Sequence, residues 1–248
     1  MIRTFGVILI SFILIACGAE SDQSSGGVGH AGSMSRFAIY NNTLYAISES
    51  KLLVVNIENR QTPLPQHSIP ISFFIETLFV FNDKLLIGAE NGMYIYSLST
   101  ENYPSFSSMF THARACDPVV AEGDYAYVTL RSGGRCWGDV NQLHIINISN
   151  FAQPFLEFSH YLFAPSGLAI DNNLLFICDG QAGLRTFDVT EKSLLTAAQA
   201  AVDKDCYDLI ANKGNLIVTE PNGIFQYDYR TLPMTELSHI QALKKKQI

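Results

Sequence analysis

The chain has 248 residues, of which 48% are hydrophobic and only 16% are charged, a balance typical of a globular protein with a substantial core. Its 16 basic and 23 acidic residues give a net charge of −7, which argues against a surface that binds nucleic acid or an anionic membrane. The 11 tyrosines and 16 phenylalanines favour β-structure.

Residues 1–16 have the pattern of a lipoprotein signal peptide. Arg3 supplies the positive start, residues 5–15 form an apolar stretch too short to span a bilayer, and Leu14-Ile15-Ala16-Cys17 resembles a lipobox. Cleavage before Cys17 would leave its thiol to carry the lipid, and several acyl chains, palmitate among them, would give a stable membrane anchor. Gly18 favours the cell outer membrane, with the body periplasmic or surface-exposed. The alternative is an ordinary secretory signal followed by a chance cysteine.

The segment that follows predicts a tether. Residues 17–34 are rich in glycine and serine and show no hydrophobic periodicity. A flexible chain of about 18 residues has a reach of roughly 20–25 Å. We therefore expect the folded body to stand off the membrane surface.

From residue 35 onward one short pattern recurs, consisting of a polar turn followed by an alternating apolar run. The copies are NTLYAI (42–47), DKLLIG (83–88), DYAYVT (124–129), NNLLFI (172–177) and GNLIVT (214–219). Aligning Leu44, Leu85, Tyr125, Leu174 and Leu216 gives spacings of 41, 40, 49 and 42 residues. A period in the low forties built from short strands is typical of β-propeller blades.

Each repeat contains four expected strands, A to D from hub to rim. They fall at 36–41, 43–48, 51–57 and 66–71; at 76–81, 84–89, 92–98 and 106–112; at 117–122, 125–130, 142–148 and 155–162; at 166–171, 174–179, 183–189 and 194–202; and at 207–212, 216–220, 223–229 and 235–241. Only 194–202 also fits a helical turn. The sequence predicts an all-β, five-bladed propeller over 35–241, followed by a solvated basic tail at 242–248, with a solenoid as the alternative.

No strand is divided between the two ends of this body. Without such a latch, the packing of blade 1 on blade 5 would have to close the ring, aided by the terminal segments.

Several segments carry a family resemblance. DGQAGLRTFDVT (179–190), GMYIYSLSTENYP (92–104) and NQLHIINISNFAQP (141–154) resemble the LVIVD repeat. RFAIYNNTLYAI, IETLFVFNDKLLIG and ACDPVVAEGDYAYVTLRSGGRC are similar to successive blades of LVIVD-repeat bacterial lipoproteins. The resemblance implies a propeller in the cell envelope and implies no assigned activity. Asn56 and Asn147 depart from it, since the repeat often has Asp there, and TEPNG in the fifth copy replaces CDGQAG of the fourth.

The two faces of the propeller differ in chemistry. The A–B turns, on the lower face, contain Asn, Asp and Gly, as tight hairpins require. The upper face, with the B–C and D–A connections, collects charged residues where strands end or begin: Glu49, Glu90, Asp179 and Glu220 after the B strands, and Arg36, Glu76, Asp117 and Asp208 at the A strands, with Arg114 and Arg131. Such a ring of charged residues on the upper face suits a cation, a polar ligand or a basic segment of a partner. The alternative is that these residues only form polar turns.

The third repeat owes its spacing of 49 to a long B–C loop at 131–142. Arg131, Arg135 and the sole tryptophan, Trp137, give this loop the composition of a recognition loop. The alternative is that Trp137 folds back as a lid over the hub.

Four cysteines besides Cys17 fall on the upper face. An even number in an exported protein suggests disulfides, and of the three possible pairings we expect Cys116–Cys136 and Cys178–Cys206. Free buried thiols are the alternative for each pair.

The sequence lacks GxSxG, HExxH and CxxC motifs in its mature part. Its histidines, His67, His112, His144, His160 and His239, lie in separate outer strands or blades and are expected at the surface or between blades. We expect no cofactor or metal, with a structural Ca²⁺ on the carboxylate rim as a lesser possibility. The leading hypothesis is a monomeric, non-enzymatic scaffold that binds an envelope protein, peptide or glycan. A hydrolase or lyase acting on an extracellular polymer at the hub is the alternative.

Overall fold

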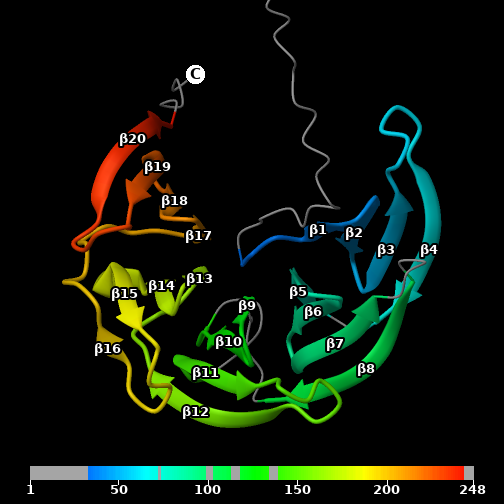
Figure 1. Ribbon diagram of the computed structural model, residues 1–248, viewed down its shortest axis with the longest axis horizontal. Helices are drawn as coiled ribbons and strands as arrows, with labels where there is room; N and C mark the ends of the chain where they lie inside the picture. Colours follow the sequence, from blue (N-terminus) through cyan, green and yellow to red (C-terminus); the bar gives the residue numbers. More distant parts are fainter. Residues whose placement is uncertain (1–32, 72–73, 99–102, 113–117, 134–138, 243–248) are drawn as a thin grey trace, which may run out of the picture.

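The computed structural model describes residues 33–71, 74–98, 103–112, 118–133 and 139–242, which form five four-stranded antiparallel sheets around a common hub (Figure 1). The predicted all-β propeller architecture is thereby confirmed. The predicted signal peptide, Cys17 and the lysines of the predicted tail lie outside these ranges. Among the residues described, no helix has the length and apolar character needed to cross a membrane.

Each blade contains four strands that are consecutive in the chain. Blade 1 consists of β1 (Phe37–Tyr40), β2 (Thr43–Ser48), β3 (Lys51–Asn56) and β4 (Leu64–Pro70). Blade 2 consists of β5 (Ile75–Phe81), β6 (Lys84–Ala89), β7 (Gly92–Leu98) and β8 (Pro104–Thr111). Blade 3 consists of β9 (Val119–Glu122), β10 (Tyr125–Leu130), β11 (Gln142–Asn147) and β12 (Phe155–Tyr161). Blade 4 consists of β13 (Leu168–Asp171), β14 (Leu174–Cys178), β15 (Leu184–Asp188) and β16 (Thr196–Ala197), with a 3₁₀ turn, η2 (Gly180–Ala182), before β15. Blade 5 consists of β17 (Asp208–Asn212), β18 (Asn215–Glu220), β19 (Gly223–Asp228) and β20 (Thr235–Gln241).

Strand pairing corrects the alignment of the repeats. The first residue of each second strand pairs with the last residue of the first strand, and these residues are Thr43, Lys84, Tyr125, Leu174 and Asn215, spaced by 41, 41, 49 and 41 residues. The sequence alignment was therefore wrong by one residue in blades 3 and 4. The apolar pattern could not separate neighbouring apolar residues there, such as Leu174 and Leu175.

The A–B turns have the backbone geometry that their composition predicts. Asn41, Asn82, Asn172, Asn173 and Lys213 have φ between 47° and 60°, in the left-handed region. Asparagine tolerates this region better than most residues, which explains its recurrence at these turns.

The outer strands bend around the rim. In blades 1, 2, 3 and 5 the pairing of the third and fourth strands shifts at the same place, after Val54, Ile95, Ile145 and Gln226. Such β-bulges curve a strand. Strand β4 begins at Leu64 rather than at the expected residue 66, and it therefore includes Pro65. A proline is tolerated there because β4 is an edge strand.

Blade 4 departs from the others at its rim. Its outer strand is only Thr196–Ala197, with an isolated bridge between Leu184 and Val202, and it forms no helical turn. The expected strand at 194–202 was therefore too long.

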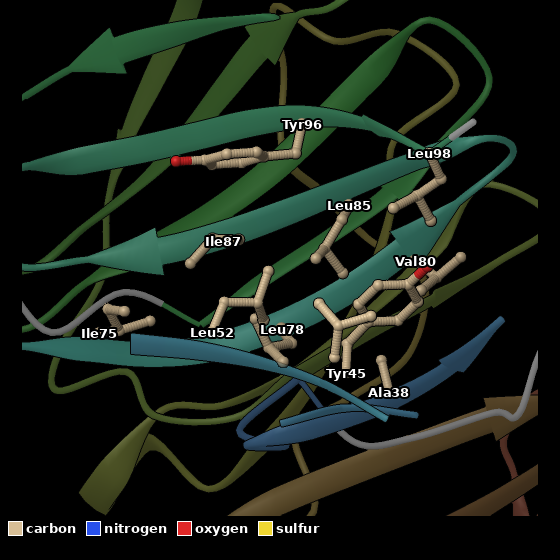
Figure 2. Close-up of a cluster of buried hydrophobic side chains, with 11 residues drawn as sticks. Ala38, Tyr45, Leu52, Ile75, Leu78, Val80, Leu85, Ile87, Tyr96 and Leu98 are labelled. Atoms are coloured by element: carbon tan, nitrogen blue, oxygen red, sulfur yellow. The ribbon is translucent and has the colours of Figure 1, made fainter. Parts of the chain in front are cut away.

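Four hydrophobic clusters join consecutive blades: blades 1 and 2, 2 and 3, 3 and 4, and 4 and 5. Figure 2 shows the first, in which Tyr45 and Leu52 of blade 1 face Leu85 and Ile87 of blade 2. All four of these side chains are fully buried. Successive side chains of a strand point to opposite faces of its sheet. One apolar face of a blade therefore packs against the preceding blade and the other against the following blade.

The ring remains open between blades 5 and 1. Figure 1 shows these two blades standing apart, and no hydrophobic cluster connects them in the described ranges. The expectation that blade 1 packs on blade 5 is therefore wrong. Instead, residues 33–36 cross the hub: Ser33 accepts a hydrogen bond from Leu168 N (2.8 Å) and Ser35 O accepts one from Leu78 N (2.8 Å), joining blade 4 to blade 2.

Candidate binding face

The upper face brings several predicted residues to strand ends around the hub. Asp179 follows β14, Glu220 ends β18 and Asp208 begins β17. Glu49 and Glu90 directly follow β2 and β6. Their positions agree with the strand assignment, but the contacts of the first three differ from those of an open carboxylate rim.

Asp179 is fully buried and serves as an anchor for the chain around it. Its Oδ1 accepts hydrogen bonds from the backbone N–H groups of Phe163 (2.8 Å) and Ala164 (2.9 Å). Its Oδ2 lies 2.8 Å from Arg185 Nη1, and the Arg185 guanidinium stacks over the ring of Phe187 at 4.5 Å. A buried carboxylate requires such pairing, so Asp179 is occupied internally.

Asp208 holds the N-terminal segment in place. Its Oδ1 accepts hydrogen bonds from Ser33 Oγ (3.2 Å), Met34 N (3.4 Å) and Leu209 N (2.9 Å). Burial raises the pKa of this carboxyl above its usual value, and the three hydrogen bonds only partly oppose the rise. Ser33 is 1% exposed, so the folded body already includes it.

Glu220 belongs to a polar cluster on blade 5. Lys204 Nζ donates to the Tyr227 hydroxyl (2.7 Å) and to Glu236 Oε2 (3.3 Å), and it lies 3.9 Å from Glu220 Oε1. Burial raises the pKa of Glu220, although the Lys204 charge opposes the rise. Burial disfavours the charge on Lys204, but its bond to Tyr227 and the nearby carboxylates outweigh this and raise its pKa.

Sequence reasoning missed Lys204, Tyr227 and Glu236. Lys204 could have been predicted from the expected Cys178–Cys206 bridge. The bridge brings the segment just before Cys206, which includes Lys204, to the upper face beside blade 5. The bridge itself is confirmed, with an S–S distance of 2.00 Å.

Two arginines remain at the surface of this face. Arg36 and Arg131 are exposed, and neither guanidinium has a hydrogen-bond or ion-pair partner in the described part of the chain. Glu49 is exposed, whereas Glu76 and Glu90 are half-buried and engaged in contacts. The base of the long loop is held by Ser132 N, which donates to Asn141 Oδ1 at 2.8 Å. Four predicted residues, Arg114, Asp117, Arg135 and Trp137, and the Cys116–Cys136 pair lie outside the described residues.

A cavity of about 240 Å³ lies in the hub, lined by the innermost strand of every blade. Its lining is mostly apolar and contains one ionisable side chain, Asp171. That carboxylate accepts a hydrogen bond from the Tyr229 hydroxyl, which ties blade 4 to blade 5. The cavity therefore offers apolar contact and no pair of converging acid–base groups along the lining residues.

Two of the histidines meet between blades 2 and 3. The rings of His112 and His144 lie edge to face, with centroids 6.2 Å apart. Burial lowers the pKa of His144 to about 4, and His112 lowers it further by charge repulsion. Within the described ranges, no three His, Cys, Asp or Glu side chains form a group suited to a metal ion. Calcium binding therefore stays a prediction.

Comparisons with known proteins agree with the fold. The crystal structure of a protein from Lactobacillus plantarum matches with a TM-score of 0.63 and 15% identity, covering 80% of this chain and 67% of that one. The periplasmic gluconolactonase of Pseudomonas aeruginosa matches with a TM-score of 0.61 and 11% identity, covering 81% and 68%. The computationally designed protein Ika8 matches with a TM-score of 0.58 and 13% identity, covering 85% and 64%. The chain thus spans about two thirds of the length of these structures, and no curated protein matches its sequence.

The five four-stranded sheets, their arrangement around a common hub and the apolar contacts between consecutive blades define a β-propeller protein. The LVIVD-repeat family model matches residues 113–161, which include all of blade 3. Blade 3 therefore contains an LVIVD repeat, the repeat that the sequence predicts.

Proposed function

We propose that the protein is a lipid-anchored, non-enzymatic scaffold of the cell envelope whose upper face binds an envelope protein, peptide or glycan. One observation carries this proposal. The buried carboxylates of this face are paired internally, whereas Arg36 and Arg131 are exposed at its surface. Exposed guanidinium groups bind carboxylates and phosphates in bidentate fashion, so the favoured partner bears anionic groups.

The direction of the chain supports a membrane-proximal face. The residues before β1 enter from the upper face, because that is where the first strand of each blade begins. Ser33 lies there against Asp208, and 16 residues separate it from Cys17. With Cys17 lipidated, a tether of that length would have an r.m.s. reach of roughly 20–25 Å, which would place the upper face nearer to the anchoring membrane than the lower face.

An enzyme acting at the hub is the alternative function. A hydrolase or lyase needs at least two converging groups with matched pKa values, and the described cavity lining contains one carboxylate. The likeness to a gluconolactonase is at 11% identity and concerns the fold. Turnover of a lactone or glycan panel by the purified protein, abolished by Asp117→Asn or Asp171→Asn, would favour the enzyme.

Cross-linking in intact cells tests the scaffold. The wild-type lipoprotein is cross-linked to its neighbours and the captured partners are identified, and the same is done with Arg131→Glu. We expect the charge reversal to lower the yield of the main partner by about tenfold. Lys213→Glu, an equal charge change on the lower face, is the control and should leave the yield unchanged. Equal yields for wild type and both variants would refute the proposed face.

A further inference from the structure

The two end blades each present a sheet face with exposed apolar side chains that no other blade covers in the described part of the chain. In blades 1 to 4 the second strand places one side chain against the following blade, and these residues, Tyr45, Leu86, Tyr127 and Phe176, are at most 1% exposed. The matching residue of blade 5, Ile217, is 39% exposed. The next position on the same face, Ile224, is 45% exposed, whereas its counterpart Met93 is 1% exposed.

Blade 1 shows the same feature on its opposite face. Leu85, Ala126, Leu175 and Leu216 pack against the preceding blade and are fully buried. Their counterpart in blade 1, Leu44, is only half-buried, and Phe37 on the same face is 57% exposed. Consecutive blades therefore form the same type of interface four times, and the two sheet faces that would form a fifth are uncovered among the described residues.

These uncovered faces lie on either side of the opening in the ring (Figure 1). At the hub the opening is spanned by residues 33–36 through the contacts of Ser33 with Asp208 and Leu168. Toward the rim it is open, and side chains such as Ile240 of β20 are 71% exposed there. The site is thus a wedge with an apolar wall on blade 1 and a polar inner end. Its wall on blade 5 contains Ile217, Ile224 and Ile240 beside a polar group of Asn215, Gln226 and Ser238.

We infer that this wedge receives propeller-type blade structure, a β-sheet apolar on both faces, supplied by a separate polypeptide. The wall of blade 1 has the side-chain pattern that a neighbouring blade covers elsewhere in this chain, as Figure 2 shows for blades 1 and 2. In the wall of blade 5, Ile217 and Ile224 occupy positions that are covered in the other blades, but Gln226 stands where Val54, Ile95 and Ile145 are buried. A continuation of that interface requires a sheet at the same spacing of about 10 Å, with apolar residues alternating along its strands. The longer propellers of similar fold fit this reasoning, since the chain spans only 64–68% of their length.

Other occupants fit the opening less well. A second copy carries five blades in an arc that turns through most of a circle, and Figure 1 shows an opening much narrower than that arc. A blade supplied by the same polypeptide would instead yield cross-links within one chain.

Site-specific photo-cross-linking tests this inference. A benzophenone amino acid is placed at Ile217 or Leu44 of the full chain in the producing cells, and at Tyr161 of blade 3, which is 85% exposed, as the control. We expect Ile217 and Leu44 to capture the same polypeptide, through peptides within strand-forming repeats, and Tyr161 not to capture it. Ile224→Arg should lower this capture by about tenfold, because it places an unpaired charge in an apolar interface. Adducts with a second copy, adducts within the chain, or no adduct would overturn the inference.

A disulfide trap on the purified protein checks the opening directly. Ile217→Cys and Leu44→Cys are combined in the full chain, and bond formation is followed by mass spectrometry of peptides under oxidising conditions. An open wedge keeps the two thiols apart, so no bond between them is expected. A bond formed within one chain would mean that blade 5 packs on blade 1, which would overturn the inference.

Discussion

Ser33 and Asp208 are 175 residues apart in the sequence, and a hydrogen bond of 3.2 Å joins the Ser33 hydroxyl to the Asp208 carboxylate. The same hydroxyl accepts a hydrogen bond from Leu168 N at 2.8 Å. One small side chain thereby holds the N-terminal segment to both blade 4 and blade 5. In a ring that no pair of blades closes, Ser33 and Met34 N, which also donates to Asp208, link the N-terminal segment to the last two blades.

Replacing this serine should weaken the whole fold. Ser33→Ala removes one acceptor and one donor at a site that is 1% exposed and leaves Leu168 N without its partner. We expect a loss of about 1–3 kcal/mol in the free energy of unfolding, measured by urea denaturation. Ser35→Ala is the matched control, since among the described residues its hydroxyl bonds only to the backbone of nearby Phe37, and it should change little. Equal effects of the two variants would contradict the proposed link.

Asp208 should give the stability an unusual pH dependence. Burial raises its pKa above 3.8 in the folded protein, so the folded state binds the proton more tightly than the unfolded chain does. Its contribution to stability is therefore present below the unfolded pKa and lost as the pH rises through the raised folded value. Asp208→Asn, whose amide oxygen can still accept hydrogen bonds, should gain stability relative to wild type as the pH rises from about 4. A difference that stays constant with pH would show that the carboxyl is not perturbed.

Most of the blade structure could be predicted because its signals are local. Alternation of apolar residues marks the strands, and asparagine at the A–B turns marks positions such as Asn41 and Asn82 with positive φ. Ring closure depends instead on whether blade 1 reaches blade 5, and no local pattern encodes that distance. Ile217 has the same apolar character as the buried Tyr45 or Phe176, so its exposure could not be read from its type.

The candidate site was only partly predictable for a related reason. The positions of Asp179, Asp208 and Glu220 follow from strand ends, and the structure places them there. Their roles depend on partners distant in sequence or across a strand, such as Ser33 for Asp208 and Arg185 for Asp179. A carboxylate at a strand end could equally be an open ligand or an internal anchor, and only packing distinguishes the two.

The Cys178–Cys206 disulfide should contribute substantially to stability. It links the end of β14 to the segment before β17 across a separation of 28 residues. In the chain-entropy model a loop of that size stabilises by about 3–4 kcal/mol. Replacing both cysteines by alanine should lower the free energy of unfolding by about that amount, and reducing agent should then have little further effect on this part of the fold. An unchanged midpoint of denaturation would contradict this expectation.

His144 should make the protein sensitive to mild acid. In the folded state its pKa is lowered to about 4, first by burial and then by repulsion from His112, compared with 6.5 for an ordinary histidine. The unfolded chain therefore binds a proton that the folded state rejects, so stability is full above about pH 6.5 and is lost as the pH falls toward 4. The loss would be on the order of 3 kcal/mol over that range. Urea denaturation of wild type and His144→Gln at several pH values checks this, with His67→Gln, at an exposed position of β4, as the control. The slope of stability with pH should flatten in His144→Gln and persist in His67→Gln; an identical slope in all three proteins would locate the acid sensitivity elsewhere.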